Sequence, residues 1–281
     1  MKKGLVLEGG AMRGMFTCGV LDVMMENGIA FDGAVGVSAG AVFGCNYKSA
    51  QAGRAIRYNT RFSRDRRYCS ASSFLRTGDL YGADFCYNRI PNELDPFDYE
   101  TYKSSPMEFY VVCTDIATGK PVYKKCESCD ESEIDWLRAS ASMPLVSHTV
   151  EIDGGAYLDG GISDSVPLAF FESIGYERCV VVLTQPRGYV KKKTRAMPVM
   201  KLMLRKYPRL VDAMERRHEM YNAACEYVFD RERSGDVLVI CPDEALPIGR
   251  IEKDPDKLRA VYEIGREVCE KRLGTLSEFL A

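Results

Sequence analysis

Residues 36–40 read Gly36-Val37-Ser38-Ala39-Gly40, a serine with a glycine two positions away on each side. An apolar run precedes this pentapeptide, and a run of small residues follows it. The pattern is typical of a nucleophile elbow, a tight strand-to-helix turn that holds a serine in a strained conformation and exposes its hydroxyl. The two glycines let the strand and helix backbones pass without a Cβ clash. A glycine-rich connection with an idle serine has the same pattern, so the rest of the chain must separate the two.

The chain contains two histidines, His148 and His218, that could serve Ser38 as a base. A Ser-His-Asp triad in the chain order usual for this elbow needs a histidine downstream of the acid. His218 falls on an apolar stripe of helical period between residues 210 and 228, which favours a core or interface position. His148 follows residues 143–145 in an expected loop. Neither histidine has the setting of a triad base.

A carboxylate is the alternative base, and the chain has two Asp-Gly-Gly sequences close together. Asp153-Gly154-Gly155 reads as a hairpin turn between two short strands. Asp159, at the exit of the second strand, is followed by Gly160 and Gly161, which add no bulk beside it. Burial beside a neutral hydroxyl raises the pKa of a carboxyl group, so Asp159 can accept the serine proton without an imidazole.

Near the N-terminus an apolar strand runs into a glycine turn that opens a helix. The turn reads Gly9-Gly10-Ala11-Met12-Arg13-Gly14. Backbone N–H groups at such a helix start suit an anion. The sequence differs from a dinucleotide fingerprint, because Ala11 takes the place of a required glycine and no acidic residue ends a second strand. An oxyanion hole fits better, with Arg13 adding positive charge.

The elbow, the second Asp-Gly-Gly and the glycine turn, in this combination, resemble the patatin-like phospholipase family over residues 4–170. Residues 114–119 and 139–144 also match stretches of that family. The resemblance implies that Ser38 is the nucleophile, that Asp159 is the general base, and that the N–H groups of Gly10 and Ala11 face the oxyanion. The family usually has a third glycine where this chain has Ala11. Alanine keeps the N–H, so the hole survives if the φ angle of Ala11 is negative.

Composition favours a cytoplasmic enzyme. A hydrophobic content of 46% is ordinary for a packed core, and a net charge of −2 argues against general nucleic-acid binding. No run is long enough for a membrane span, and the apolar stretch after Lys3 is too short for a secretion signal. Eleven cysteines with no such signal are expected to be reduced thiols. Cys126 and Cys129 form a single Cys-x-x-Cys, which is weak evidence for zinc, and no metal or other cofactor is expected.

Strands and helices alternate along the first two thirds of the chain. This order predicts a three-layer α/β fold with a mostly parallel central sheet and helices on both faces. We expect a catalytic domain over residues 4–184 and an α-rich extension over 185–281 that packs on the same sheet. Strands are predicted at 4–8, 33–37, 108–113, 120–124, 178–184 and 237–240, and helices at 12–26, 39–53, 131–141, 165–174, 196–230 and 255–273.

Residues 187–209 carry nine lysines and arginines and no acidic residue around a methionine-rich centre. A solvated helix face is the ordinary interpretation. The functional interpretation is a segment that meets an anionic membrane surface, or a mobile lid over an acyl pocket.

Together these features predict a serine hydrolase that cleaves acyl esters of lipids through a Ser38–Asp159 dyad and an acyl-enzyme. One alternative is a non-catalytic lipid- or acyl-binding protein that keeps the fold. Another is an ordinary α/β-hydrolase that uses His148 or His218. The sequence leaves the headgroup, the acyl-chain length and the oligomeric state open.

Overall fold

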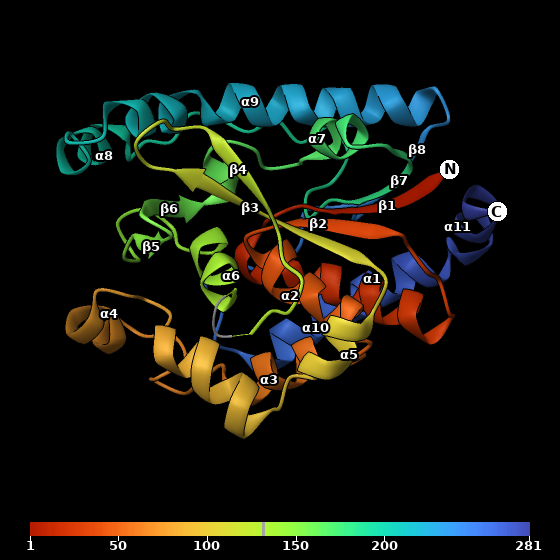
Figure 1. Ribbon diagram of the computed structural model, residues 1–281, viewed down its shortest axis with the longest axis horizontal. Helices are drawn as coiled ribbons and strands as arrows, with labels where there is room; N and C mark the ends of the chain where they lie inside the picture. The colour runs from red at the N-terminus through yellow and green to blue at the C-terminus, as the bar shows by residue number, and fades with distance from the viewer. Residues whose placement is uncertain (131–132) are drawn as a thin grey trace.

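The computed structural model describes residues 1–130 and 133–281, and within these ranges it contains a sheet of eight strands between two helical layers. Figure 1 shows the sheet edge-on, with α7 and α9 above it and α1, α2 and α10 below. This arrangement confirms the predicted three-layer α/β fold. The strands are β1 (Lys2–Leu7), β2 (Gly33–Val37), β3 (Glu108–Asp115), β4 (Pro121–Lys125), β5 (Val150–Ile152), β6 (Gly155–Asp159), β7 (Tyr176–Val182) and β8 (Val237–Ile240).

The centre of the sheet is parallel and one side of it is antiparallel. β3, β2, β1, β7 and β8 are successive neighbours, and each pair among them is parallel. β4 and β6 both pair with β3 in the antiparallel sense, and β5 pairs with β6. Parallel strands buried on both faces read as continuous apolar runs, which is why β1, β2 and β7 are recognisable in the sequence.

The two faces of the sheet carry separate cores. Along β1, Leu5 and Leu7 pack into the core between the sheet and the helices α1 and α10, whereas Val6 packs into the core between the sheet and the helices α7 and α9. This alternation follows the two-residue period of a strand. The helices of these layers are α1 (Gly14–Glu26), α2 (Ala39–Lys48), α7 (Leu168–Ser173), α9 (Pro208–Arg233) and α10 (Pro255–Glu270).

Residues 54–104 form a helical insert that the sequence analysis did not predict. Its first helix, α3, has a strongly amphipathic pattern that the crowded arginines obscure. The insert lies against the lower helical layer in Figure 1 and bounds one side of the site described below. Its elements are α3 (Arg54–Phe62), α4 (Ala71–Thr77), the π-helix η2 (Phe85–Leu94) and α5 (Tyr99–Ser104).

The C-terminal third extends the same sheet. β8 pairs with β7 at the sheet edge, as predicted, and α10 packs against α1. The single helix predicted at 196–230 is wrong: the structure has α8 (Met197–Met203) and α9, separated before Pro208. Proline disfavours a helical conformation in the residue before it, which explains the break. The domain boundary at residue 184 stays a prediction.

Two further α-helices lie among the described residues. α6 (Ile134–Ser140) lies within the helix predicted at 131–141, of which residues 131–132 fall outside the described residues. α11 (Leu273–Leu280) follows α10, and its separation from α10 was not predicted. Among the described residues, no helix combines the length and the apolar character needed to cross a bilayer.

Candidate active site

Ser38 lies in the turn between β2 and α2 with the strained backbone that the sequence predicts. Its φ is +54° and its ψ is −121°, a conformation that non-glycine residues rarely adopt. A Cβ on Gly36 would lie 2.6 Å from the Cα of Ala41, and a Cβ on Gly40 would lie 2.5 Å from the carbonyl oxygen of Leu7. The elbow therefore needs both glycines for steric reasons.

Asp159 reaches Ser38 because β2 and β6 share one edge of β3. Two strands that pair with the same residues of β3 must lie on its opposite edges. β4 shares paired residues of β3 with β2 and also with β6. β4 therefore occupies one edge of β3, and β2 and β6 both occupy the other. β2 ends with Val37 paired to Val112, and β6, running the other way, ends with Asp159 paired to Cys113. The strand ends thus meet head to head.

Ser140, at the end of α6, links β3 to the elbow through two hydrogen bonds. Its Oγ donates a hydrogen bond to the carbonyl oxygen of Val112 at 2.7 Å and accepts one from the N–H of Ser38 at 2.8 Å. The side chain is fully buried. The sequence analysis noted the surrounding stretch 139–144 but assigned Ser140 no role.

Asp159 is buried, and its carboxylate is already held in place. The N–H of Gly161 donates a hydrogen bond to Asp159 Oδ1 at 2.8 Å. Burial raises the pKa of Asp159 above its usual range, and the charge of Arg217 and the nearby hydroxyl of Ser38 partly oppose this rise. Asp159 is therefore a stronger base than an exposed aspartate and lies next to Ser38.

The glycine turn lies between β1 and α1, beside the elbow. A Cβ on Gly9 would lie 2.9 Å from the Cβ of Ser38, so this glycine permits the close approach. Within the described chain, the N–H of Met12 donates to the carbonyl oxygen of Arg250 and the N–H of Arg13 donates to that of Gly10, whereas the N–H groups of Gly10 and Ala11 donate to no recorded acceptor.

One expectation about this turn is wrong. The φ angle of Ala11 is +49°, not negative. Ala11 thus adopts the left-handed conformation that glycine takes without strain, at a typical cost of about 1–2 kcal/mol for an alanine. Its N–H is still free of an internal acceptor, so the substitution of alanine for glycine does not remove this donor. Gly14, the last residue of the predicted turn, is the first residue of α1.

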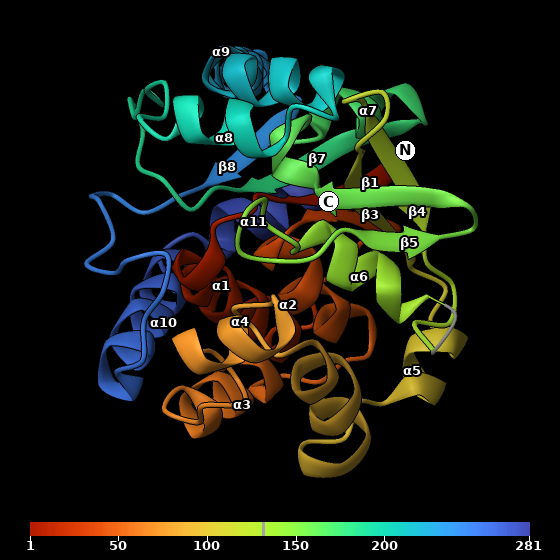
Figure 2. The same ribbon diagram turned by 90° about the vertical axis from the view of Figure 1, so that its left-hand side faces the viewer.

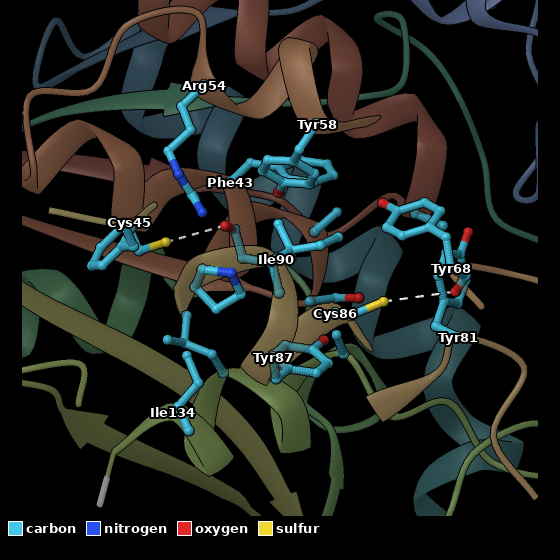
Figure 3. A pocket seen from close by; sticks show the side chains of 18 of the residues that line it. Phe43, Cys45, Arg54, Tyr58, Tyr68, Tyr81, Cys86, Tyr87, Ile90 and Ile134 are labelled. Carbon is cyan, nitrogen blue, oxygen red and sulfur yellow. Dashed lines mark hydrogen bonds between the residues drawn. The ribbon is translucent and has the colours of Figure 1, made fainter. Parts of the chain in front are cut away.

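An apolar cavity of about 130 Å³ opens beside Ser38 and runs between α2 and the helical insert. Arg54 also borders it, but its guanidinium is paired with Asp95 at 3.4 Å and donates to Asn46 Oδ1 at 2.9 Å. Burial raises the pKa of the bordering Tyr58 and Tyr68 far above the usual tyrosine range, so both phenols stay neutral. Figure 3 shows the side chains that line the cavity, among them Phe43, Tyr58, Tyr68, Tyr87, Ile90 and Ile134.

A second, polar cavity of about 470 Å³ opens on the other side of Ser38 and also contains Asp159. Residues far apart in the sequence meet in it, because α9 and the loops after β7 and β8 cover this end of the sheet. From the sequence, Arg13 was expected near the oxyanion hole, and Lys191 and Lys192 were expected in the membrane-facing segment 187–209 and not in a cavity. Arg217 and Arg250 were given no role. The positively charged side chains lining it, among the described residues, are Arg13, Lys191, Lys192, Arg217 and Arg250.

The two histidines lie in different places. His148 is exposed, and its Nε2 is 2.7 Å from the carbonyl oxygen of Thr77, away from both cavities. His218 borders the polar cavity from α9, where its Nδ1 is 3.1 Å from the carbonyl oxygen of Glu215. Among the described residues, neither imidazole ring forms a hydrogen bond with Ser38. Among the described residues, no cluster of three or more His, Cys, Asp or Glu side chains could hold a metal ion.

Asp153 is the turn residue that the sequence predicts. It follows β5 and precedes Gly154, and the φ angles of the two residues are +51° and +79°. Two successive positive φ angles are typical of the tight turn of a two-residue hairpin. Asp153 is exposed and borders neither cavity, so only the second of the two Asp-Gly-Gly sequences contributes to the site.

A three-layer α/β fold with a serine at a nucleophile elbow and a buried carboxylate beside it is typical of one class of serine hydrolase scaffold. The sequence profile of the patatin-like phospholipase family matches residues 5–171 of this chain. The chain belongs to the patatin-like phospholipase family. Residues 207–281 match a domain of unknown function (DUF6363).

Relatives of known sequence agree with this assignment. The chain is 32% identical to the uncharacterized protein YjjU of Escherichia coli over 191 residues, which are 65% of this chain and 52% of YjjU. It is 28% identical to lysophospholipase nte1 of Aspergillus oryzae over 179 residues, which are 61% of this chain and 11% of that protein. This chain therefore spans about half of the first relative. The crystal structure of VipD from Legionella pneumophila aligns with a TM-score of 0.44 at 13% identity, over 96% of this chain and 67% of VipD.

Proposed function

We propose that this chain is a serine hydrolase that cleaves acyl ester bonds of lipids. The observation that carries the proposal is the juxtaposition of Ser38, on its strained elbow, with the buried, raised-pKa carboxylate of Asp159, at the point where the two cavities meet. Membership of the patatin-like phospholipase family and the likeness to a lysophospholipase support a lipid ester as substrate.

The reaction follows from this geometry in two halves. Ser38 Oγ loses its proton to Asp159 and attacks the ester carbonyl, and the N–H groups of Gly10 and Ala11 stabilise the oxyanion. The intermediate collapses, the alcohol leaves with the proton from Asp159, and an acyl-enzyme remains. Asp159 then takes a proton from water, the hydroxide attacks the acyl-enzyme, and Ser38 regains its hydrogen as the fatty acid is released.

The apolar cavity is the proposed site of the acyl chain. Its lining is aromatic and aliphatic, and the buried charge of Arg54 is compensated by Asp95. Burying an alkyl chain there contributes about 0.8 kcal/mol per methylene group. The polar cavity then takes the alcohol half of the ester, because Ser38 lies between the two cavities.

We also propose that the end of the molecule around these cavities meets an anionic lipid surface. α4 and α8 both lie at this end, away from the N-terminus in Figure 1, with α8 on the upper side of the sheet and α4 on the lower side (Figures 1 and 2). Leu75 on α4 is 84% exposed, and Leu202 and Met203 on α8 are 69% and 62% exposed. Basic side chains surround the apolar residues of α8, namely Arg195, Arg205, Lys206 and Arg209. Apolar side chains that enter lipid, ringed by cations that meet phosphates, are typical of interfacial helices.

A fluorophosphonate probe tests the proposal. The probe reacts with an activated serine and remains covalently attached to it, so we expect stoichiometric labelling of the wild type and none of Ser38→Ala. Mass spectrometry of the labelled peptide identifies the site. An unlabelled, folded wild type that still binds lipid would establish the non-catalytic alternative instead.

A panel of lipid esters tests the substrate. Free fatty acid and the matching alcohol, detected by mass spectrometry, are the expected products. Labelling of Ser38 without release of fatty acid from any lipid ester would restrict the proposal to a general serine hydrolase.

A further inference from the structure

The polar cavity holds more positive charge than its carboxylates compensate. Its two carboxylates, Glu8 and Asp159, both have partners already. Glu8 is buried and accepts hydrogen bonds from the N–H of Thr184 at 2.5 Å, from Thr184 Oγ1 at 3.1 Å and from Tyr221 Oη at 2.9 Å. Asp159 accepts from the N–H of Gly161. Five cationic side chains thus face two carboxylates, so three positive charges remain to be compensated by a ligand or by solvent.

Arg13 is the clearest case. Its Nε is buried and has no hydrogen-bond partner among the described residues. No ion pair joins its guanidinium to a carboxylate of the described chain. A buried guanidinium N–H without an acceptor costs about 1–3 kcal/mol or more, so native proteins rarely leave one in this state. A ligand oxygen in the cavity would supply the acceptor.

Lys191 is held in the same cavity without a carboxylate partner. Its backbone is fixed by Asn222, whose Oδ1 accepts from the N–H at 2.8 Å and whose Nδ2 donates to the carbonyl oxygen at 3.1 Å. Its Nζ lies 3.9 Å from the ring centroid of Tyr221. Burial, then the nearby charge of Arg217, lowers the pKa of Lys191 to about 8. The fold thus holds this ammonium at a site where the loss of solvent and the nearby cations disfavour its charge.

Arg217 and Arg250 complete the cluster from α9 and from the loop after β8. Arg217 Nε donates to the carbonyl oxygen of Gly161 at 2.5 Å, which aims the guanidinium at the loop that carries Asp159. Arg250 is exposed at the cavity and forms no ion pair with a described carboxylate. Arginine forks bind phosphate oxygens in a bidentate manner, and a lysine adds a point charge.

We propose that this cluster binds a phosphate group on the alcohol half of the ester and disfavours headgroups in which a quaternary ammonium accompanies the phosphate. The inference rests on the proposed function, because it assigns the alcohol half to the polar cavity. The cations of the cavity outnumber its two carboxylates, so the net positive charge attracts a phosphate dianion and repels a choline group. Lys191, Arg217 and Arg250 all lie outside the segment 5–171 that matches the family.

Hydrolysis of three lipids with the same acyl chain tests selectivity: lysophosphatidate, lysophosphatidylcholine and monoacylglycerol. We expect kcat/KM for lysophosphatidate to exceed that for lysophosphatidylcholine by about 10-fold or more, as the loss of one or two charge-assisted contacts implies. Lys191→Gln and Arg250→Gln should each lower kcat/KM for lysophosphatidate by about 10-fold and lower that for monoacylglycerol, which has no phosphate, much less. Lys191→Arg should restore most of the loss.

Two exposed residues outside both cavities supply matched controls. Lys103→Gln removes one lysine charge and Arg259→Gln removes one arginine charge, as the two test substitutions do, and neither should change the hydrolysis of any of the three lipids. Equal kcat/KM for lysophosphatidate and lysophosphatidylcholine, or equal losses for all three lipids in Lys191→Gln, would overturn the inference.

Binding of lysophosphatidate to the Ser38→Ala variant tests this inference independently of the proposed function, because the variant cannot form an acyl-enzyme. Calorimetry with lysophosphatidate below its critical micelle concentration measures the Kd of Ser38→Ala and of the double variant that also carries Lys191→Gln. We expect the Kd of the double variant to be about 10-fold higher. Inorganic phosphate should bind at least 10-fold more weakly, since it lacks the acyl chain. Equal affinity for inorganic phosphate would identify a free-phosphate site and overturn the headgroup assignment. Binding of lysophosphatidate without hydrolysis by the wild type would reject the proposed function alone.

Discussion

Ser38 and Asp159 lie next to each other along one edge of β3, because Asp159 and the residue before Ser38 pair with adjacent positions of that strand. Val37, before the serine, pairs with Val112, and Asp159 pairs with Cys113. The hydroxyl of Ser38 lies close enough to the Asp159 carboxyl group to lower its pKa. Two segments more than a hundred residues apart thus bring together the two residues of the proposed dyad.

The dyad predicts a sharp division among single substitutions. Ser38→Ala and Asp159→Asn should each lower kcat for a soluble ester by about 10³-fold or more, because members of one catalytic unit fail together. His148→Ala and His218→Ala should keep most of the activity, since neither ring bonds to Ser38. A folded His218→Ala protein as inactive as Ser38→Ala would replace the dyad with a triad. Circular dichroism of each variant supplies the folding control.

Local patterns in the sequence predicted the elements that hold the dyad. The apolar run before Ser38 and the glycines around it specify the strand, the turn and the helix, and the structure has all three. The Asp153–Gly154 turn was also predictable, because two positive φ angles restrict the residues that can occupy it.

Long-range relations were not predictable in the same way. Nothing near Asp159 in the sequence says that β6 shares the edge of β3 with β2, and nothing near Arg217, Lys191 or Arg250 says that they converge beside Ser38. These contacts depend on how α9 and the loops after β7 and β8 fold over the sheet. The positive φ of Ala11 has the same origin, because tertiary contacts impose a conformation that alanine alone disfavours.

The hairpin aspartate provides a test of the choice between the two Asp-Gly-Gly sequences. Asp153→Asn should change the rate by well under 10-fold and the free energy of unfolding by less than about 1 kcal/mol, because asparagine tolerates a positive φ. Asp153→Val should lower the free energy of unfolding by about 1–2 kcal/mol, since a β-branched residue is strained there. Loss of turnover in Asp153→Asn, with Asp159→Asn active, would show that the base is Asp153. Urea denaturation and ester kinetics measure the two effects.

The raised pKa of Asp159 predicts the acid side of the pH profile. The base must be ionised, so kcat/KM for an uncharged soluble ester should rise with pH through a midpoint above the usual aspartate value of about 3.9. Arg217 lowers the pKa of Asp159 by its charge, so Arg217→Gln should move the midpoint to higher pH. Arg216→Gln, an exposed neighbour on α9, is the matched control and should leave it in place. A midpoint that falls in Arg217→Gln would contradict this electrostatic coupling.

The lowered pKa of Lys191 predicts how KM for an anionic substrate changes at alkaline pH. Lys191 loses its charge as the pH rises through about 8, so KM for lysophosphatidate should increase above that pH while KM for monoacylglycerol stays constant. Lys191→Arg should remove the increase, because arginine stays protonated. A pH-independent KM in the wild type would show that Lys191 does not contact the phosphate. The charged and titratable groups that face Lys191 are Glu8, Arg13, Arg217, Tyr221, Cys225 and Arg250.

The exposed apolar side chains of α8 predict how the protein meets aggregated lipid. Leu202 and Met203 are more than half exposed next to basic residues, so we expect them to enter the lipid while the cations meet phosphates. Leu202→Ser combined with Met203→Ser should weaken binding to anionic vesicles by about 10-fold or more, since full burial of each side chain is worth about 1.5–3 kcal/mol. Hydrolysis of a short soluble ester should not change, because neither residue borders a cavity. Ile174→Ser, after α7, is the control, and vesicle co-sedimentation is the measurement. Equal vesicle binding by wild type and double variant would reduce α8 to an ordinary solvated surface.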